Sequence, residues 1–451
     1  MLGFETIGNA TVIVHDGSPI LATDPWLNGD AYFGSWGLSH PIPEEQIAHV
    51  KACRYVWLSH AHPDHTNFDS LLELTHCEIL LADHVGGRMK ADLETQGFRV
   101  RIVPSARWVS LSPRIRVFML ADRNQDSILL IDVNGTLLLD LNDAQDHGWG
   151  RICRSIARTF RRSYLLRLYP ASDADMMNFF SEDGKREVPP YIARRAPVGA
   201  ALQADASRFH VSRVIPFSSF HRYQRDDSVW ANEFTLPLNS YREGASAAGP
   251  EILDPFVRVN CETGEVTPLR SAETSGLVRP ASDFGDDWSH QLDADDKRKL
   301  KRYILAKEKL RDSFGFIRFR VGGEDTTIDL DKNNRAGITF EVPRHSLMLA
   351  VKHRVFDDLL IGNYMKTTLH GPALLYLGFS PVVGKYADNG LAQSREELKR
   401  YFAIYRGRDP VGHLLFALRE KSNDVMCRIV RSRDAGLRTA GRIRRRLISI
   451  G

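Results

Sequence analysis

"VWLSHAHPDHTNFD", residues 56–69, places three histidines and an aspartate within six positions. Its first residues belong to a short apolar run with β-branched and aromatic members, which predicts a buried strand. The loop that follows a strand can turn side chains two positions apart toward one point, so His60 and His62 can bind one ion. Asp64 and His65 can bind a second. The stretch therefore predicts a metal-binding loop at a strand end.

The composition is that of an ordinary globular protein. The chain has 451 residues, 43% hydrophobic and 26% charged, with a net charge of +4, so bulk charge indicates no particular partner. Five scattered cysteines without a CxxC pair exclude a zinc ribbon and a disulfide framework, and they favour a reducing setting. Neither a signal peptide nor a transmembrane run is recognisable. We therefore expect a cytoplasmic protein.

The pattern along the chain predicts two domains. Alternating strands open it, strands interleaved with helices follow, and residues 150–210 look mainly helical, which together indicate an α/β sandwich. A long helix is expected from about residue 291 to Gly315, with alternating strands and further helices after it. The expected divisions are a metal-binding domain at 1–235, an irregular connector at 236–290, a smaller α+β domain at 291–436 and a basic tail at 437–451.

The loop "HAHPDH" in this context resembles the metallo-β-lactamase fold superfamily. The resemblance implies an αββα sandwich with a one- or two-metal site along one edge. It also implies that Asp143, in "TLLLDLNDAQDHG", bridges the two metals. His221, in "IPFSSFHRYQ", matches the last ligand, a late histidine at a strand end, and is a second candidate for a catalytic group beside Asp64.

One histidine of the family pattern is missing. The family expects it shortly before the bridging aspartate, and this sequence has none between His84 and His147. Asp122 or Asn124 could take its place, or His147 could turn inward. Alternatively the site holds a single ion.

Further residues are expected around the ligands. Asp24 ends a strand that should lie beside the metal loop, where its carboxylate could accept the second N–H of a ligand histidine. Asn142 and His147 are expected in the same supporting role near the bridging aspartate. Trp26 and Trp36 are expected to line the cleft.

The segments "DPWLNGDAYFGSWGL", "LSHAHPDHTN" and "LNDAQ" resemble a narrower group, the metallo-β-lactamase-like part of CMP-N-acetylneuraminate and UDP-N-acetylmuramate hydroxylases. The later segment around "VFDDLL" is similar to that group too. The resemblance implies oxidation of a sugar N-acetyl group at non-haem iron. The paired cysteine and histidine signature of a Rieske cluster is absent from the sequence, so a separate Rieske or ferredoxin donor would be needed.

Two activities and one inactive alternative remain open. As a hydroxylase, the chain would hold iron and act on an N-acetyl amino-sugar or nucleotide-sugar. As a hydrolase, it would hold zinc or manganese and cleave a phosphoester, lactone or amide. Asp64 or Asp143 would then orient the attacking water, and His221 would protonate the leaving group. The third hypothesis is a degenerate member that binds metal without turnover.

Basic side chains indicate an anionic substrate. Arg222 and Arg225 follow the expected ligand His221, and the arginine fork suits phosphate or carboxylate. Lys366 could reach the mouth of the site from the second domain. The basic tail alternates arginines with apolar residues and could contact a membrane surface. An aromatic-and-basic pattern typical of nucleic-acid binding is lacking, so a nucleic-acid partner is not expected.

Overall fold

The computed structural model describes residues 1–169, 174–187, 197–274 and 276–418. The expected basic tail at 437–451 lies outside the described residues, as does the last part of the expected 291–436 domain.

The first sheet of the sandwich has eight strands, in the order β19-β18-β1-β2-β3-β5-β6-β7. Strands β1, β2 and β3 form the antiparallel meander that the sequence predicts, and β3, β5, β6 and β7 run parallel. The bounds are β1 Leu2–Ile7, β2 Thr11–Asp16, β3 Ser18–Thr23, β5 Tyr55–Leu58, β6 Glu78–Ala82, β7 Arg99–Val103, β18 Val257–Asn260 and β19 Val266–Pro268.

The second sheet has seven strands, in the order β17-β15-β12-β11-β10-β9-β8. Neighbouring strands from β8 to β11 are antiparallel, and β11, β12, β15 and β17 run parallel. The bounds are β8 Trp108–Ser110, β9 Ile115–Ala121, β10 Ser127–Val133, β11 Thr136–Asn142, β12 Arg162–Arg167, β15 Arg213–Pro216 and β17 Glu251–Ile252.

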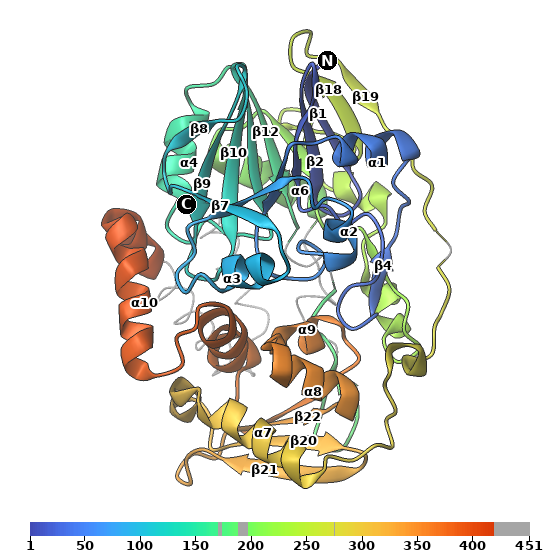
Figure 1. The fold of residues 1–451 in the computed structure, drawn as a ribbon, viewed down its shortest axis with the longest axis vertical. Helices are drawn as coiled ribbons and strands as arrows, with labels where there is room; N and C mark the ends of the chain where they lie inside the picture. Colours follow the sequence, from blue (N-terminus) through green and yellow to red (C-terminus); the bar gives the residue numbers. More distant parts are fainter. Residues whose placement is uncertain (170–173, 188–196, 275, 419–451) are drawn as a thin grey trace.

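The main core lies between these two sheets, where Phe4, Trp57 and Leu138 are fully buried in one apolar cluster. Helices cover both outer faces (Figure 1). They are α1 Glu44–Lys51, α2 Phe68–Leu72 and α3 Arg88–Thr95 on the first sheet, and α4 Gly150–Ala157 and α6 Val198–Phe209 on the second. The expected αββα sandwich is confirmed.

A smaller α+β domain packs below the sandwich in Figure 1, with α9 on the side that faces it. Its six-stranded sheet has the order β14-β13-β23-β22-β20-β21 and its own apolar core. The bounds are β13 Phe179–Phe180, β14 Arg186–Glu187, β20 Phe316–Val321, β21 Glu324–Asp329, β22 Gly337–Glu341, β23 Lys366–His370, α7 Ala294–Leu305, α8 Arg344–His353, α9 Phe356–Ile361, the π-helix η6 Pro381–Asn389 and α10 Arg395–Arg408.

Residues 236–290, expected to be an irregular connector, contain β17, β18 and β19 and so complete both sandwich sheets. Val257 and Val259 of β18 are buried, while Arg258 between them is half-exposed, so the short strand does alternate. It approaches β1 closely at Gly3, where a Cβ atom would lie 2.0 Å from the carbonyl oxygen of Val259. A glycine at this position therefore permits the pairing.

The interval 150–210, expected to be mainly helical, contains the central strand β12 between α4 and α6. Helices or strands cover β12 on both faces, so its residues from Ser163 onward are all buried and show no period-two alternation. The expected long helix at 291–315 ends at Leu305 because Lys307 turns inward to pair with Asp388.

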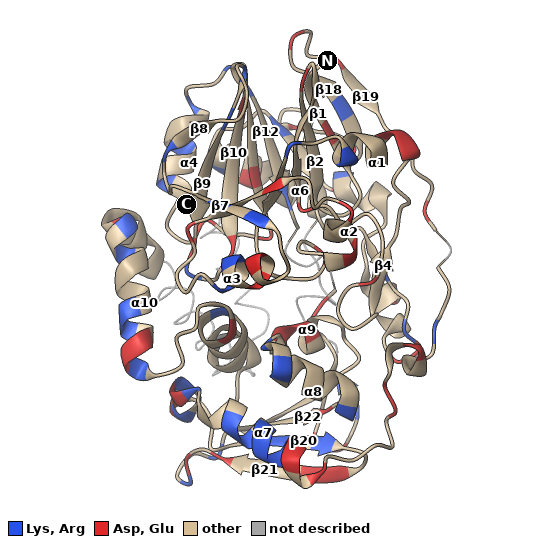
Figure 2. Ribbon diagram, in the orientation of Figure 1, with Lys and Arg blue, Asp and Glu red and all other residues tan. Residues whose placement is uncertain are grey.

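Charge follows this layering. In Figure 2 the central sandwich strands are almost free of charged residues, whereas α7 and α10 carry bands of both signs. None of the helices in the described part of the chain combines the length and apolarity that crossing a bilayer requires.

Truncating a core side chain tests this assignment. Leu138→Ala should lower the free energy of unfolding by about 2–5 kcal/mol, because it leaves a cavity between the two sheets. Leu72→Ala, at a position that is 61% exposed, is the matched control and should change it little. Denaturant unfolding checks both; equal effects would contradict the assigned core.

Candidate metal centre

The two sandwich sheets meet at one edge, where the loop after β5 faces the residue after β11. His60 and His65 come from the first of these segments and Asp143 from the second. One ligand atom from each of the three lies within 4.8 Å of the other two. The structure thus brings together residues more than 75 positions apart, as strand ends of two facing sheets allow.

Each loop histidine is held by one ring nitrogen and points the other inward. His60 has Nδ1 at 2.9 Å from Ser59 Oγ, and its Nε2 lies 2.9 Å from Nδ1 of His62. The remaining nitrogen of His62, Nε2, lies 3.2 Å from Asp357 Oδ2. Such outer contacts fix the tautomer and the ring orientation of ligand histidines.

The two ring nitrogens of His65 both face carboxylates. Its Nδ1 lies 2.9 Å from Asp24 Oδ2, while its buried Nε2 has no hydrogen-bond partner and faces Asp64 Oδ2 at 3.1 Å and Asp143 Oδ2 at 3.4 Å. Burial acts to lower the pKa of His65, but the three surrounding carboxylates outweigh it and raise the pKa well above its ordinary value. A metal ion at this point would take the role that the proton otherwise plays.

The charge balance fits a bound cation. Buried carboxylates surround the three imidazoles, and Lys385 is the positively charged side chain that contacts them. Buried carboxyl groups are stable when they are paired, coordinate a metal or take up a proton. The buried aspartates around the centre include Asp24, Asp64, Asp122, Asp126, Asp140, Asp357 and Asp358.

Asp24 links the two sheets below the ligands. Its fully buried carboxylate accepts hydrogen bonds from the backbone N–H and the hydroxyl of Ser59 at 2.7 and 2.6 Å, and from Asn142 Nδ2 at 2.7 Å. Asp24 and Asn142 both adopt positive φ, 38° and 47°, which turns their side chains out of the strand direction. Asp24 and Asn142, two of the three expected supporting residues, therefore both contact His65 Nδ1.

Asp64 is anchored on both oxygens. Oδ1 accepts from the hydroxyl of Tyr32 at 2.5 Å and Oδ2 from Asn9 Nδ2 at 2.9 Å. Burial acts to raise the pKa of Asp64, but His65 and Tyr32 lower it below its ordinary value overall. Asp143 is held in the same way by the hydroxyl of Ser218, at 3.0 Å.

The turn between β9 and β10, where the family pattern expects a histidine, supplies Asp126. Its Oδ1 lies 4.0 Å from His60 Nδ1 and 3.7 Å from Lys385 Nζ. Sequence reasoning named Asp122 and Asn124 here; Asp122 instead accepts the turn N–H groups, and Asn124 Nδ2 lies 2.8 Å from His147 Nε2. His147 thus packs against the turn.

The second domain contributes to the centre, which sequence reasoning missed. Asp357 and Asp358 open α9 and form a second ligand-type cluster with His62. Lys385, from the π-helix η6, lies 3.5 Å from His62 Nε2. The available signal was the segment "VFDDLL", already noted as similar to the hydroxylases, whose paired acids begin a buried helix.

His221 is placed beside the centre. It is buried on β16 (His221–Tyr223), which pairs with β4 (Trp36–Leu38), and its ring stacks on Trp36 with centroids 3.3 Å apart. Within the described residues, the triad of close ligand atoms at the sheet edge does not include it. Its role as ligand or catalytic group stays a prediction.

The side chains expected at a substrate surface lie elsewhere. Trp26 is fully buried, with its indole N–H bonded to Gly29 O. Arg225 is fully buried and pairs with Asp227 and Asp286, so its fork is used within the fold. This corrects the expectation for these two residues, because core contacts satisfy them.

Arg222 and Lys366 keep some exposure and pair with acids. Arg222 Nη1 lies 2.8 Å from Glu273 Oε1, and Lys366 Nζ lies 2.7 Å from Glu341 Oε1. Nothing in these contacts connects either residue with the metal loop, and their roles in substrate binding stay predictions.

A cavity of about 340 Å³ opens beside Asp143 and Asp126. Arg167, His147 and Phe416 are among the residues that line it, so the wall combines polar groups with an aromatic face. The cavity provides space for a small polar ligand next to the candidate metal site.

The αββα sandwich with a histidine-rich loop at a strand end is the arrangement of the metallo-β-lactamase fold. No family model matches the chain. Over 153 residues it is 28% identical to the cytidine monophosphate-N-acetylneuraminic acid hydroxylase of Asterias rubens. This match covers 32% of the chain and 23% of that relative, so the chain is similar to only about a quarter of the length of this curated protein.

Solved structures resemble the chain more distantly. The diiron β-hydroxylase CmlA from Streptomyces venezuelae is 16% identical with a TM-score of 0.36, covering 59% of this chain and 54% of that one. The metallo-β-lactamase fold protein YhfI from Bacillus subtilis is 9% identical with a TM-score of 0.30, covering 55% and 88%.

Removing the carboxylate beneath His65 tests the centre. Asp24→Asn should weaken metal binding by on the order of 10- to 100-fold, since the new amide would meet only hydrogen-bond donors and His65 would lose its orientation. Asp16→Asn is the matched control, because Asp16 also accepts from Ser112 and Arg114 but lies at the far end of β2. Metal titration checks both; unchanged affinity in Asp24→Asn would rule out this role.

Proposed function

We propose that the chain is a metal-dependent hydroxylase that uses iron to oxidise the N-acyl group of an amino-sugar or nucleotide-sugar. The observation that carries the proposal is the donor set. Two carboxylates, Asp64 and Asp143, face His65 Nε2, and further buried acids stand behind them. Oxygen-rich sets with imidazole suit iron and manganese, whereas zinc sites use fewer carboxylates.

The similarity to the N-acetylneuraminic acid hydroxylase supports the reaction class. Bound iron would supply the activation of dioxygen. Overall, one oxygen atom would be inserted into a C–H bond of the substrate, and the other would leave as water, with two electrons from a separate donor and two protons from solvent. A Rieske or ferredoxin protein has the chemistry for that role.

The chain's own residues would orient and balance the centre. Asp24, Ser59 and Asp357 fix the three imidazoles, so each presents one ring nitrogen inward. Tyr32 holds Asp64, and Lys385 offsets the acids from the second domain.

The cavity beside Asp143 would hold the acyl-sugar part of the substrate. Asp175 is a candidate for moving protons near Asp143, because burial and the negative charge of Asp143 raise its pKa to about 6. We place the reaction in the reducing cytoplasm, because Cys53, Cys77, Cys153 and Cys261 are buried free thiols.

Metal analysis combined with turnover tests the proposal. Protein purified aerobically should contain iron, and with a reduced ferredoxin and a CMP-linked N-acetyl amino-sugar it should incorporate one atom from heavy-isotope dioxygen. Asp143→Asn should lose both iron and turnover, because it removes the carboxylate shared by His60 and His65.

Asp132→Asn is the control, since Asp132 pairs with Arg116 near the hairpin end of β10. It should retain iron and activity. Zinc as the sole bound metal, together with cleavage of a phosphodiester or lactone, would overturn the hydroxylase in favour of a hydrolase.

A further inference from the structure

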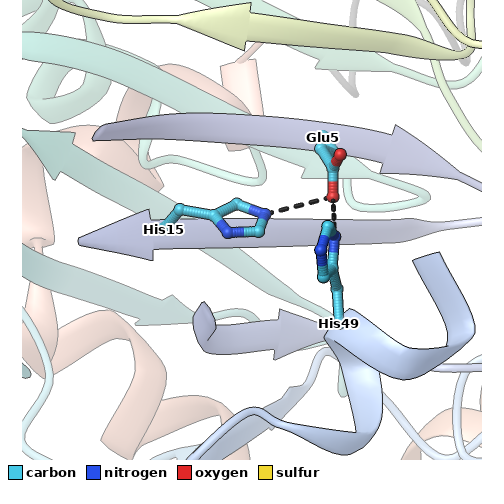
Figure 3. Close-up of side chains that lie close together, drawn as sticks. All are labelled: Glu5, His15 and His49. Carbon is cyan, nitrogen blue, oxygen red and sulfur yellow. Dashed lines mark hydrogen bonds and ion pairs between the residues drawn. The ribbon is translucent and has the colours of Figure 1, made fainter. Parts of the chain in front are cut away.

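We propose that Glu5, His15 and His49 form a zinc site on the outer face of the first sheet, separate from the candidate metal centre (Figure 3). One ligand atom from each residue lies within 4.8 Å of the other two. The site does not depend on the proposed hydroxylase activity, and none of its residues takes part in the centre at the β5 and β11 ends.

Local structure brings the three side chains together. Glu5 lies opposite Ile13 in the β1–β2 pair, so His15, two residues further on, shares the face of Glu5. Helix α1 covers this face, where its Val50 packs in one cluster with Ile13. His49 lies in the last turn of the same helix, and its imidazole points toward Glu5 on the sheet (Figure 3).

The two imidazoles contact the same carboxylate oxygen of Glu5. His15 Nε2 lies 3.1 Å and His49 Nδ1 2.8 Å from Glu5 Oε2. Around a tetrahedral zinc with bonds of about 2.0–2.1 Å, donor atoms stand roughly 3.3 Å apart. The two distances from Glu5 Oε2 therefore need to grow by no more than about half an ångström to admit the ion, and the two histidine nitrogens already lie within 4.8 Å of each other.

The other oxygen of Glu5 is anchored separately. Oε1 accepts from Arg258 Nε at 2.6 Å and from Gln46 Nε2 at 3.3 Å. This leaves Oε2 directed at the imidazoles, which is the outer-contact arrangement of ligand carboxylates.

Two imidazoles and one carboxylate are a common zinc set, which leaves a fourth position for water. Exposure matches it: the side chains of Glu5 and His15 are 0% and 5% exposed, whereas that of His49 is 28% exposed. Zinc here would join α1 to β1 and β2 and stabilise the folded chain, because only the folded state presents the three ligands together.

Zinc titration of the metal-free, full-length protein by calorimetry tests the site. His49→Gln should bind one zinc equivalent less than the unmodified protein and should show a smaller rise in Tm with zinc. The glutamine still hydrogen-bonds Glu5, so the fold should persist. His15→Gln should reproduce the loss from the other side of the cluster.

His290→Gln is the matched control, because His290 is an exposed histidine that pairs with Asp287. It should bind as much zinc as the unmodified chain. Equal zinc stoichiometry in His49→Gln and the unmodified protein would overturn the proposal, whatever the centre at Asp143 binds. Failure of the hydroxylase would instead appear in iron content and turnover, with the His49-dependent equivalent unchanged.

Discussion

The buried carboxylate of Asp24 is the contact on which the candidate centre depends. It ends β3, accepts from Ser59 after β5 and from Asn142 at the end of β11, and orients His65. One side chain thus fastens the metal loop to both sheets. Burial raises the pKa of Asp24, although the charge and hydrogen bonds of His65 and the hydrogen bonds of Ser59 act to lower it.

The second domain is part of the centre. Asp357 holds His62, and Lys385 stands between His62 and Asp126. Helix α10 secures the turn that carries Asp126, since Gln125 Nε2 donates to the hydroxyl of Tyr401 at 2.9 Å. The geometry of the metal loop is therefore coupled to packing between domains, and the charge balance of the acids is shared across their boundary.

Local patterns carried most of what could be predicted. The meander, the metal loop and the role of Asp24 follow from short segments whose period and spacing are visible in sequence. The contact between His62 and Asp357 spans 295 positions, and no short pattern reports such a pairing. The prediction for Arg225 rested on its sequence neighbours, which suggested a substrate-binding loop. In the structure Asp227 and Asp286 pair with Arg225 inside the core, and Asp286 lies too far along the chain for a local pattern to report it. The strand β12 lacked alternation because both of its faces are covered.

The pairing of β1 with β18 has a consequence for biosynthesis. Strand β1 is translated well before its partner along one edge, which follows some 250 residues later. Until then that edge presents unpaired backbone groups to any neighbouring chain. In the same way, strand β13 is translated long before its partner β23. Each of these edges can therefore be paired only after the later strand has been translated.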